Sequence, residues 1–213
     1  MSRTYKVNSR VLTAAIGCGG RLAGNTAGAL PRVQVHDVFA APMAASVSAA
    51  TSLLITAVAV SDTTGATGVI IAQPEFPRNL TVWCTVANTA NVTIVGTDQF
   101  DAAQTEVIAA NGAAIVAGTK IFKSITSVTS ANRSGSATTL SIGQGSILGT
   151  SRRIVGCGID GGVFTTASGE TTMVQETTRP VRAVTALVHG VTFNTALADT
   201  KTYELTYFTD EAR

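Results

Sequence analysis

The sequence predicts an all-β protein, specifically a β-sandwich of the jelly-roll or Ig-like type with an extended N-terminal arm. Apolar and polar residues alternate with a period of two in many short runs, which is typical of half-buried strands. Turn-forming residues separate these runs at close spacing, as they do in sandwiches and barrels. The composition agrees, because the 213-residue chain holds 33 Thr and β-branched side chains favour strands.

The clearest strand prediction is the run 80–86, where Thr81, Trp83 and Thr85 alternate with apolar residues. Other runs with this texture are 91–97, 105–109, 120–129, 138–142, 171–177, 181–193 and 201–209. Turns are expected at 62–65, 98–101, 132–135 and 143–145. Asn111-Gly112 predicts a type I′ hairpin turn. The best helix candidate is the Ala-rich segment 43–52.

Composition divides the chain into an arm and one domain. Residues 1–32 are rich in glycine and basic, with no acidic residue before Asp37. The backbone freedom of glycine disfavours regular structure, so we expect an extended arm. Residues 33–213 are expected to form a single β-sandwich domain, in which 150–178 is a loop or hairpin insertion.

The chain carries few charges, with 13% charged residues and a formal net charge of +2. An ordinary soluble domain has about 25% charged residues. A disordered chain would show low hydrophobicity and high net charge, and a typical nucleic-acid binder would show a larger basic excess. No apolar run reaches the ~18 residues of a membrane span. The low charge instead favours a surface that neighbouring subunits cover.

The sequence shows no convincing catalytic apparatus, and we expect a non-enzymatic protein with no cofactor and no metal. A GxGxxG match at 156–161 is followed by strand-like residues, whereas a dinucleotide site needs a helix there. His36-Asp37 could form a base and its orienter, but no nucleophile motif accompanies the pair. Cys84 lies in an apolar alternation and is expected to be a small core residue, whereas Cys18 and Cys157 lie in Gly-rich loops.

Several strand-and-turn runs carry a resemblance to a known family. They are FPRNLTV at 76–82, NVTIVGTD at 91–98, TEVI at 105–108, GTKIFKSITSV at 118–128, TLSIGQGSILG at 139–149 and KTYELTYFT at 201–209. Together these runs resemble a recurring structural protein of tailed-bacteriophage virions, most like a capsid decoration (cement) protein. The resemblance implies a β-sandwich fold, a place in the virion and no catalysis. The segment 150–178 departs from the resemblance.

We therefore expect a cement protein on the capsid surface that bridges and stabilises neighbouring major-capsid subunits. Its expected partners are copies of itself, as a homotrimer, and the major capsid protein, without direct contact to nucleic acid or membrane. Edge strands of a sandwich could contribute by strand addition. The expected contact residues are basic: Arg3, Lys6 and Arg10 of the arm, and Arg152 and Arg153.

Two alternatives remain open from the sequence. The first is a tail or fibre component of the phage, although the elongated repeats of many fibres are absent from the sequence. The second is a carbohydrate-binding β-sandwich module, which needs a cluster of exposed aromatic side chains. Only Trp83, Tyr203 and Tyr207 are reasonable candidates for that cluster, and packing in the core explains them equally well.

Overall fold

The computed structural model describes residues 32–39, 54–60, 65–86, 89–132, 138–153, 160–167, 170–175, 181–182, 189–193, 197 and 201–210. These residues form strands and turns without a helix, in three antiparallel sheets. The prediction of an all-β, sandwich-like fold is confirmed. The expected arm up to residue 31 and the helix candidate at 43–52 lie outside the described residues. Within the described part, therefore, no helix could cross a membrane.

Two of the sheets face each other and form the sandwich. The first has the order β12-β13-β9-β4-β7, and β2 also pairs with β9. Its strands are β12 (Val181–Arg182), β13 (Gly190–Thr192), β9 (Thr138–Gly149), β4 (Arg78–Cys84), β7 (Val116–Phe122) and β2 (Val58–Val60). The second has the order β3-β8-β5-β6. Its strands are β3 (Ala66–Gly68), β8 (Ser124–Ser130), β5 (Asn91–Thr97) and β6 (Ala103–Ala109).

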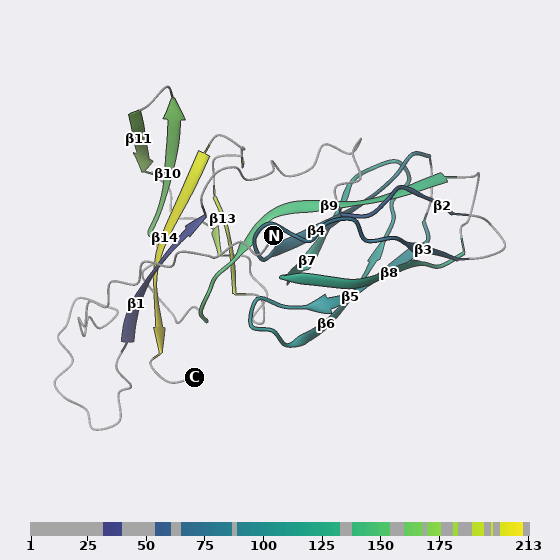
Figure 1. Ribbon diagram of the computed structural model, residues 1–213, viewed down its shortest axis with the longest axis horizontal. Coiled ribbons are helices and arrows are strands. Elements are labelled where there is room, and N and C mark those ends of the chain that lie inside the picture. Colours follow the sequence, from purple (N-terminus) through teal and green to yellow (C-terminus); the bar gives the residue numbers. More distant parts are fainter. Residues whose placement is uncertain are drawn as a thin grey trace.

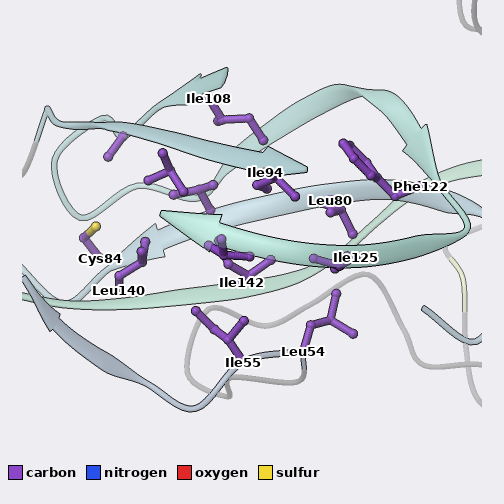
Figure 2. Packing of buried hydrophobic residues seen from close by; sticks show 14 of the residues in the cluster. Leu54, Ile55, Leu80, Cys84, Ile94, Ile108, Phe122, Ile125, Leu140 and Ile142 are labelled. Carbon is purple, nitrogen blue, oxygen red and sulfur yellow. The ribbon is translucent and has the colours of Figure 1, made fainter. Parts of the chain in front are cut away.

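The sandwich core lies between these two sheets and is almost entirely aliphatic (Figure 2). Leu80, Leu140 and Ile142 enter it from β4 and β9, and Ile94 and Ile108 enter it from β5 and β6. All five side chains have exposed fractions of 4% or less, so the alternating pattern places one complete face of each strand inside. Cys84 is a free thiol in this core, which confirms the prediction of a small core residue.

A third sheet, which we call the end sheet, lies at the other end of the chain's fold (Figure 1). Its order is β1-β14-β10-β11, with β1 (Arg32–Phe39), β14 (Lys201–Asp210), β10 (Asp160–Ala167) and β11 (Glu170–Gln175). A second hydrophobic cluster, the end core, contains Val35 and Phe39 of β1 and Tyr203, Leu205 and Tyr207 of β14. The strand β11 returns antiparallel to β10 as a hairpin within the segment 150–178.

Strand β9 belongs to both cores. Leu140 and Ile142 lie in the sandwich core, whereas Leu148 near the end of the same strand lies in the end core. Beyond Gly149 the chain turns away through Thr150, whose amide and hydroxyl both donate to the His189 carbonyl. One continuous strand therefore connects the two cores. The assignment of residues 33–213 to a single domain stays a prediction.

The run 181–193 is not one strand, because its two ends, β12 and β13, pair antiparallel to each other. Three further local predictions from the sequence are wrong. The run 120–129 is two strands, because the chain passes at Lys123 from β7 in one sheet to β8 in the other. Residues 143–145 continue β9 instead of turning, and the missing side chain of Gly145 leaves room for Asn79: a Cβ there would lie 2.2 Å from the Asn79 Oδ1. At the third site, positive φ occurs at Gly112 and not at Asn111.

The turn at Gly112 is consequently shifted by one residue from the prediction. Asn111 and Ala114 form an isolated antiparallel bridge, with the Ala114 amide donating to the Asn111 carbonyl. Gly112 is then the first central residue, and its φ of 60° with no positive φ at Ala113 matches a type II′ turn. A type I′ turn would need positive φ at both central residues.

Candidate functional site

The outward surface of the sheet β3-β8-β5-β6 is the most distinctive surface of the described molecule, and we call it the neutral face. Strand register places its side chains in rows, such as Thr67, Thr129, Thr93 and Val107 across the four strands. The full set of outward residues on the four strands is Thr67, Asn91, Thr93, Val95, Thr97, Ala103, Thr105, Val107, Ala109, Ser124, Thr126, Ser127 and Thr129. None of them is ionisable.

The four strands of this sheet hold only one ionisable residue, Glu106, and it points inward with an exposed fraction of 8%. Val107 beside it is 56% exposed on the neutral face. The segment that continues β3 adds two further exposed aliphatic side chains, Val69 at 66% and Ile71 at 58%. A surface of threonine, serine, alanine and valine can be wetted, yet desolvating it strips no charge of its hydration.

Charges occur only at the border of the neutral face. Lys123 and Asp101 form an exposed ion pair of 2.6 Å next to the start of β8. Lys120 reaches from β7 to the edge of β6, where its Nζ donates to the Thr105 carbonyl. Asp98, which follows β5 directly, adds a carboxylate at this border. The ion pair contributes no net charge and Asp98 offsets Lys120, so these described charges leave the border without a net charge.

One seam of the sandwich, between β6 and β7, is closed by side chains instead of by a ladder of backbone bonds. The Glu106 Oε1 accepts hydrogen bonds from the amides of Thr119 (2.7 Å) and Lys120 (3.2 Å) and from the Thr119 hydroxyl. Gln104 donates to the Ile121 carbonyl. Two amides and one carbonyl of β7 are therefore bonded to side chains of β6. The Glu106 Oε2 is buried without a hydrogen-bond partner among the described residues.

The edge of β8 is closed in a similar way beyond the short strand β3. The Gln73 side chain donates from its Nε2 to the Ile125 carbonyl (3.0 Å), and its Oε1 accepts from the Ile125 amide (2.6 Å). A side-chain amide thus takes the place of a peptide group of a neighbouring strand. The sequence suggested that another chain could add a strand at a sheet edge. At Ile125, Thr119 and Lys120, however, the backbone groups that an added strand would need already bond to side chains of this chain.

A second polar cluster joins the end sheet to the turn after β9. Asp37 is buried, and its carboxylate accepts from the Ser151 amide (2.8 Å), the Ser151 hydroxyl (2.5 Å) and the Tyr207 hydroxyl (2.9 Å). The Tyr207 oxygen accepts in turn from the Arg152 amide. Burial, together with the nearby Asp37 charge, raises the pKa of Tyr207 well above its ordinary range. The tyrosine is therefore held as a neutral hydrogen-bond donor.

The structure describes two of the predicted contact residues, Arg152 and Arg153. Both lie in the turn after β9, beside this polar cluster, and we call that region the junction. Both are exposed. The Arg153 guanidinium lies over the Phe100 ring at 5.5 Å, and Phe100 packs edge-on against His189 at 5.7 Å. Arg153 thus ties the sandwich to the junction within one chain. Arg3, Lys6 and Arg10 lie outside the described residues.

The Phe100 contact depends on the predicted turn at 98–101, which is confirmed. The Asp98 carboxylate accepts from the amides of Phe100 (2.8 Å) and Ala102 (2.9 Å), as an aspartate that begins a turn does. Asp101 has a φ of 66° there.

Arg78 is the largest fully buried side chain, and it lies at the start of β4. Its Nε and Nη2 both donate to the Gly145 carbonyl. Desolvation lowers the pKa of Arg78 to about 10, against the charges of Glu75 and Tyr203, which raise it. The guanidinium satisfies a buried carbonyl next to the bulged pairing of β4 with β9, which is a structural use of the charge.

Of the candidate pair His36-Asp37, the Asp37 carboxylate accepts from the Ser151 and Tyr207 hydroxyls, and the side chain of His36 lies outside the described part. Among the described residues, no three His, Cys, Asp or Glu side chains come together in a group that could hold a metal ion. The aromatic platform is not formed either. Tyr203 and Tyr207 are fully buried, and the half-buried Trp83 donates its indole N–H to the Ala113 carbonyl.

Comparison of the chain with known protein families, with curated proteins and with solved structures finds no match. Sequence reasoning missed the neutral face, although a signal was present: within 91–97, 103–109 and 124–130 the only acidic or basic residue is Glu106.

Proposed function

We propose that this protein is a non-enzymatic structural protein of a tailed-bacteriophage virion, a capsid cement protein that bridges neighbouring major-capsid subunits. The observation that carries the proposal is the neutral face. A sheet surface of four strands without one ionisable side chain has a low electrostatic cost of being covered by another protein. The resemblance of the strand-and-turn runs to virion structural proteins supports the same role.

The sealed edges of the sandwich also fit a protein that works at high local concentration. Open sheet edges in crowded copies would pair without control. Glu106, Gln104 and Gln73 occupy the backbone groups at which such pairing would begin. The protein would then associate through its neutral face and not through strand edges. The arm before β1 would supply a second contact.

The arm supplies the basic contacts of the proposed mechanism, and Arg152 supplies a further one at the junction. Thirty-one residues precede β1, which begins at Arg32. A fully extended segment of this length reaches on the order of 100 Å, far enough to contact a neighbouring subunit. Arg3, Lys6 and Arg10 would lie against an acidic capsid surface, and copies of this chain would assemble as a trimer where capsid subunits meet.

The test is the number of copies per purified particle, measured by quantitative mass spectrometry against the major capsid protein. Hundreds of copies are expected for a cement protein. A handful of copies would instead favour the alternative, a tail or fibre component, and absence from particles would contradict the virion role.

A truncation refines the same test. Removal of residues 1–31 leaves β1 complete and is expected to weaken binding to particles that lack the protein. Arg152→Ala in the full chain probes the other proposed contact without changing the arm, and it is expected to weaken binding separately. Unchanged binding of the truncated chain would remove the arm from the mechanism.

A further inference from the structure

The neutral face is a surface without a partner in the described chain, and its chemistry restricts what can cover it. A strongly acidic or basic partner would bury its own charges against threonine and valine, without an opposite charge to compensate them. The face therefore selects a neutral partner surface. The outward side of the same sheet on another molecule meets that requirement, because it carries the same uncharged rows.

We propose that two copies of this chain stack through their neutral faces, related by a two-fold axis. In such an isologous contact each copy contributes the same patch. Like charges cannot oppose each other anywhere on the four strands, since Glu106 points into the sandwich. The exposed aliphatic side chain of Val107 lies on this surface at the edge strand β6, and Val69 and Ile71 follow β3 at the opposite edge. These aliphatic side chains gain the most from being covered. The inference deepens the proposed structural role and rests on it.

The size of the face predicts a weak contact. Three strands of seven residues and the three-residue β3, spaced by about 4.8 Å, give a surface of roughly 400 Å² per copy. Two copies then cover about 800 Å², below the ~1,000 Å² that a stable specific interface usually needs. A pair of this kind forms when copies are concentrated and separates on dilution, which suits an assembly that holds many copies together.

Stacking also leaves the rest of each molecule available. The junction with Arg152, the end sheet and the arm all lie on other elements than β3, β8, β5 and β6. A threefold contact made elsewhere on the surface is therefore compatible with the pair. The sealed seams matter here, because Gln73 and Glu106 direct association to the face and away from the edges.

The experiment measures self-association of the full-length protein by sedimentation velocity over a concentration series, up to its solubility limit. We expect the mass to rise from 21.7 kDa toward that of two copies. Val107→Lys is expected to weaken association at least tenfold. The matched control is Ile115→Lys, which places the same charge at another exposed aliphatic residue, 44% exposed, outside the neutral face, and should associate like the wild type.

A mixing experiment separates loss of the contact from loss of folding. Val107→Glu is also expected to stay a single copy by itself, whereas an equimolar mixture with Val107→Lys should pair again. A wild type that remains a single copy at every concentration, equal weakening by Ile115→Lys, or no pairing in the mixture would each overturn the inference. If the single-copy wild type still binds particles and Val107→Lys does not, shell protein covers the face, and only the stacking inference fails.

Discussion

The two cores of this molecule use polar side chains in opposite ways. In the sandwich, the core is aliphatic and the polar groups lie at its rims, where Gln73 and Glu106 bond to strand edges. In the end core, by contrast, Phe39 and Tyr203 pack beside a buried carboxylate, Asp37, that binds Ser151 and Tyr207. Polar groups at a rim insulate a sheet from other chains, whereas polar groups inside a core fix one part of the chain onto another.

The largest expected effects come from variants that remove a buried side chain from one core at a time, which tests whether the two cores unfold together. Leu80→Ala in the sandwich and Leu205→Ala in the end core each remove a fully buried leucine, and each should cost about 2–5 kcal/mol of unfolding free energy. Because β9 contributes to both cores, we expect one cooperative transition that both variants lower. Denaturation followed by Trp83 fluorescence, which reports the sandwich, and by near-ultraviolet circular dichroism of tyrosine, which reports mainly the end core, checks this.

Separate transitions would contradict that expectation. If Leu205→Ala shifts only the tyrosine signal and leaves the Trp83 transition in place, the end core unfolds by itself. The prediction of a single domain for residues 33–213 would then be wrong.

A second comparison uses two glycines of the sandwich. Gly145→Ala places a Cβ 2.2 Å from the Asn79 Oδ1 and disturbs the bonds of Asn79 to the Gly118 carbonyl and the Ile147 amide. We expect a loss of about 2–3 kcal/mol. The control, Gly112→Ala, meets no atom within 4 Å but has a φ of 60°, and should cost about 1 kcal/mol. Urea denaturation measures both, and a larger loss for Gly112→Ala would refute the packing argument.

The sequence predicted the strands of the sandwich well because their patterns are local. The run 91–97 coincides with β5, and Thr138 begins β9 as expected. Two of the errors have causes far away in the sequence. Whether residues 143–145 turn or continue depends on Asn79, which is 66 positions away in the chain, and the break at Lys123 depends on the separation of two sheets.

The candidate site was predictable only in part. The low charge indicated a covered surface, but the register that gathers uncharged rows on one face is set by pairing between strands. Arg152 and Arg153 are exposed, and their role as capsid or subunit contacts stays a prediction. The stacking of Arg153 on Phe100 could not be foreseen, because the two residues are 53 positions apart in the sequence.

The end core can be probed through its hydroxyl network. Tyr207→Phe removes the bond to Asp37 and the acceptor of the Arg152 amide, and should cost about 1–2 kcal/mol near neutral pH. The pKa of Tyr207 is raised in the folded state, so its contribution is complete below the ordinary value of 10 and is lost as pH rises above it. Unfolding free energies measured between pH 8 and 11 should fall more steeply for the wild type than for the variant.

The quantity to follow is the difference in unfolding free energy between the wild type and Tyr207→Phe at each pH. Arg78, with a pKa lowered to about 10, contributes a pH dependence of opposite sign in the same range, and it is present in both. Parallel pH profiles for wild type and Tyr207→Phe would contradict the assigned role of the hydroxyl.

The smallest expected change in stability comes from Gln73, a polar side chain at the rim of the sandwich. Gln73→Ala removes two hydrogen bonds to Ile125 at a partly exposed position and should cost about 1 kcal/mol. The opened edge of β8 should also raise the tendency to aggregate, measured by light scattering on prolonged incubation. Thr85→Ala removes a comparable bond, from the Thr139 amide to an exposed hydroxyl, but in β9, which is flanked by β2 and β4. It serves as the control, and equal scattering from both variants would argue against an edge-sealing role.

Strand β9 also has a mechanical consequence. It is bonded to β4 along one side and to β2 and β13 along the other, and it runs from one core into the next (Figure 1). A tension applied between the two ends of the molecule would act along this strand and load its flanking hydrogen bonds together in shear, instead of opening them one after another. Such a tie resists stretching best along its own axis.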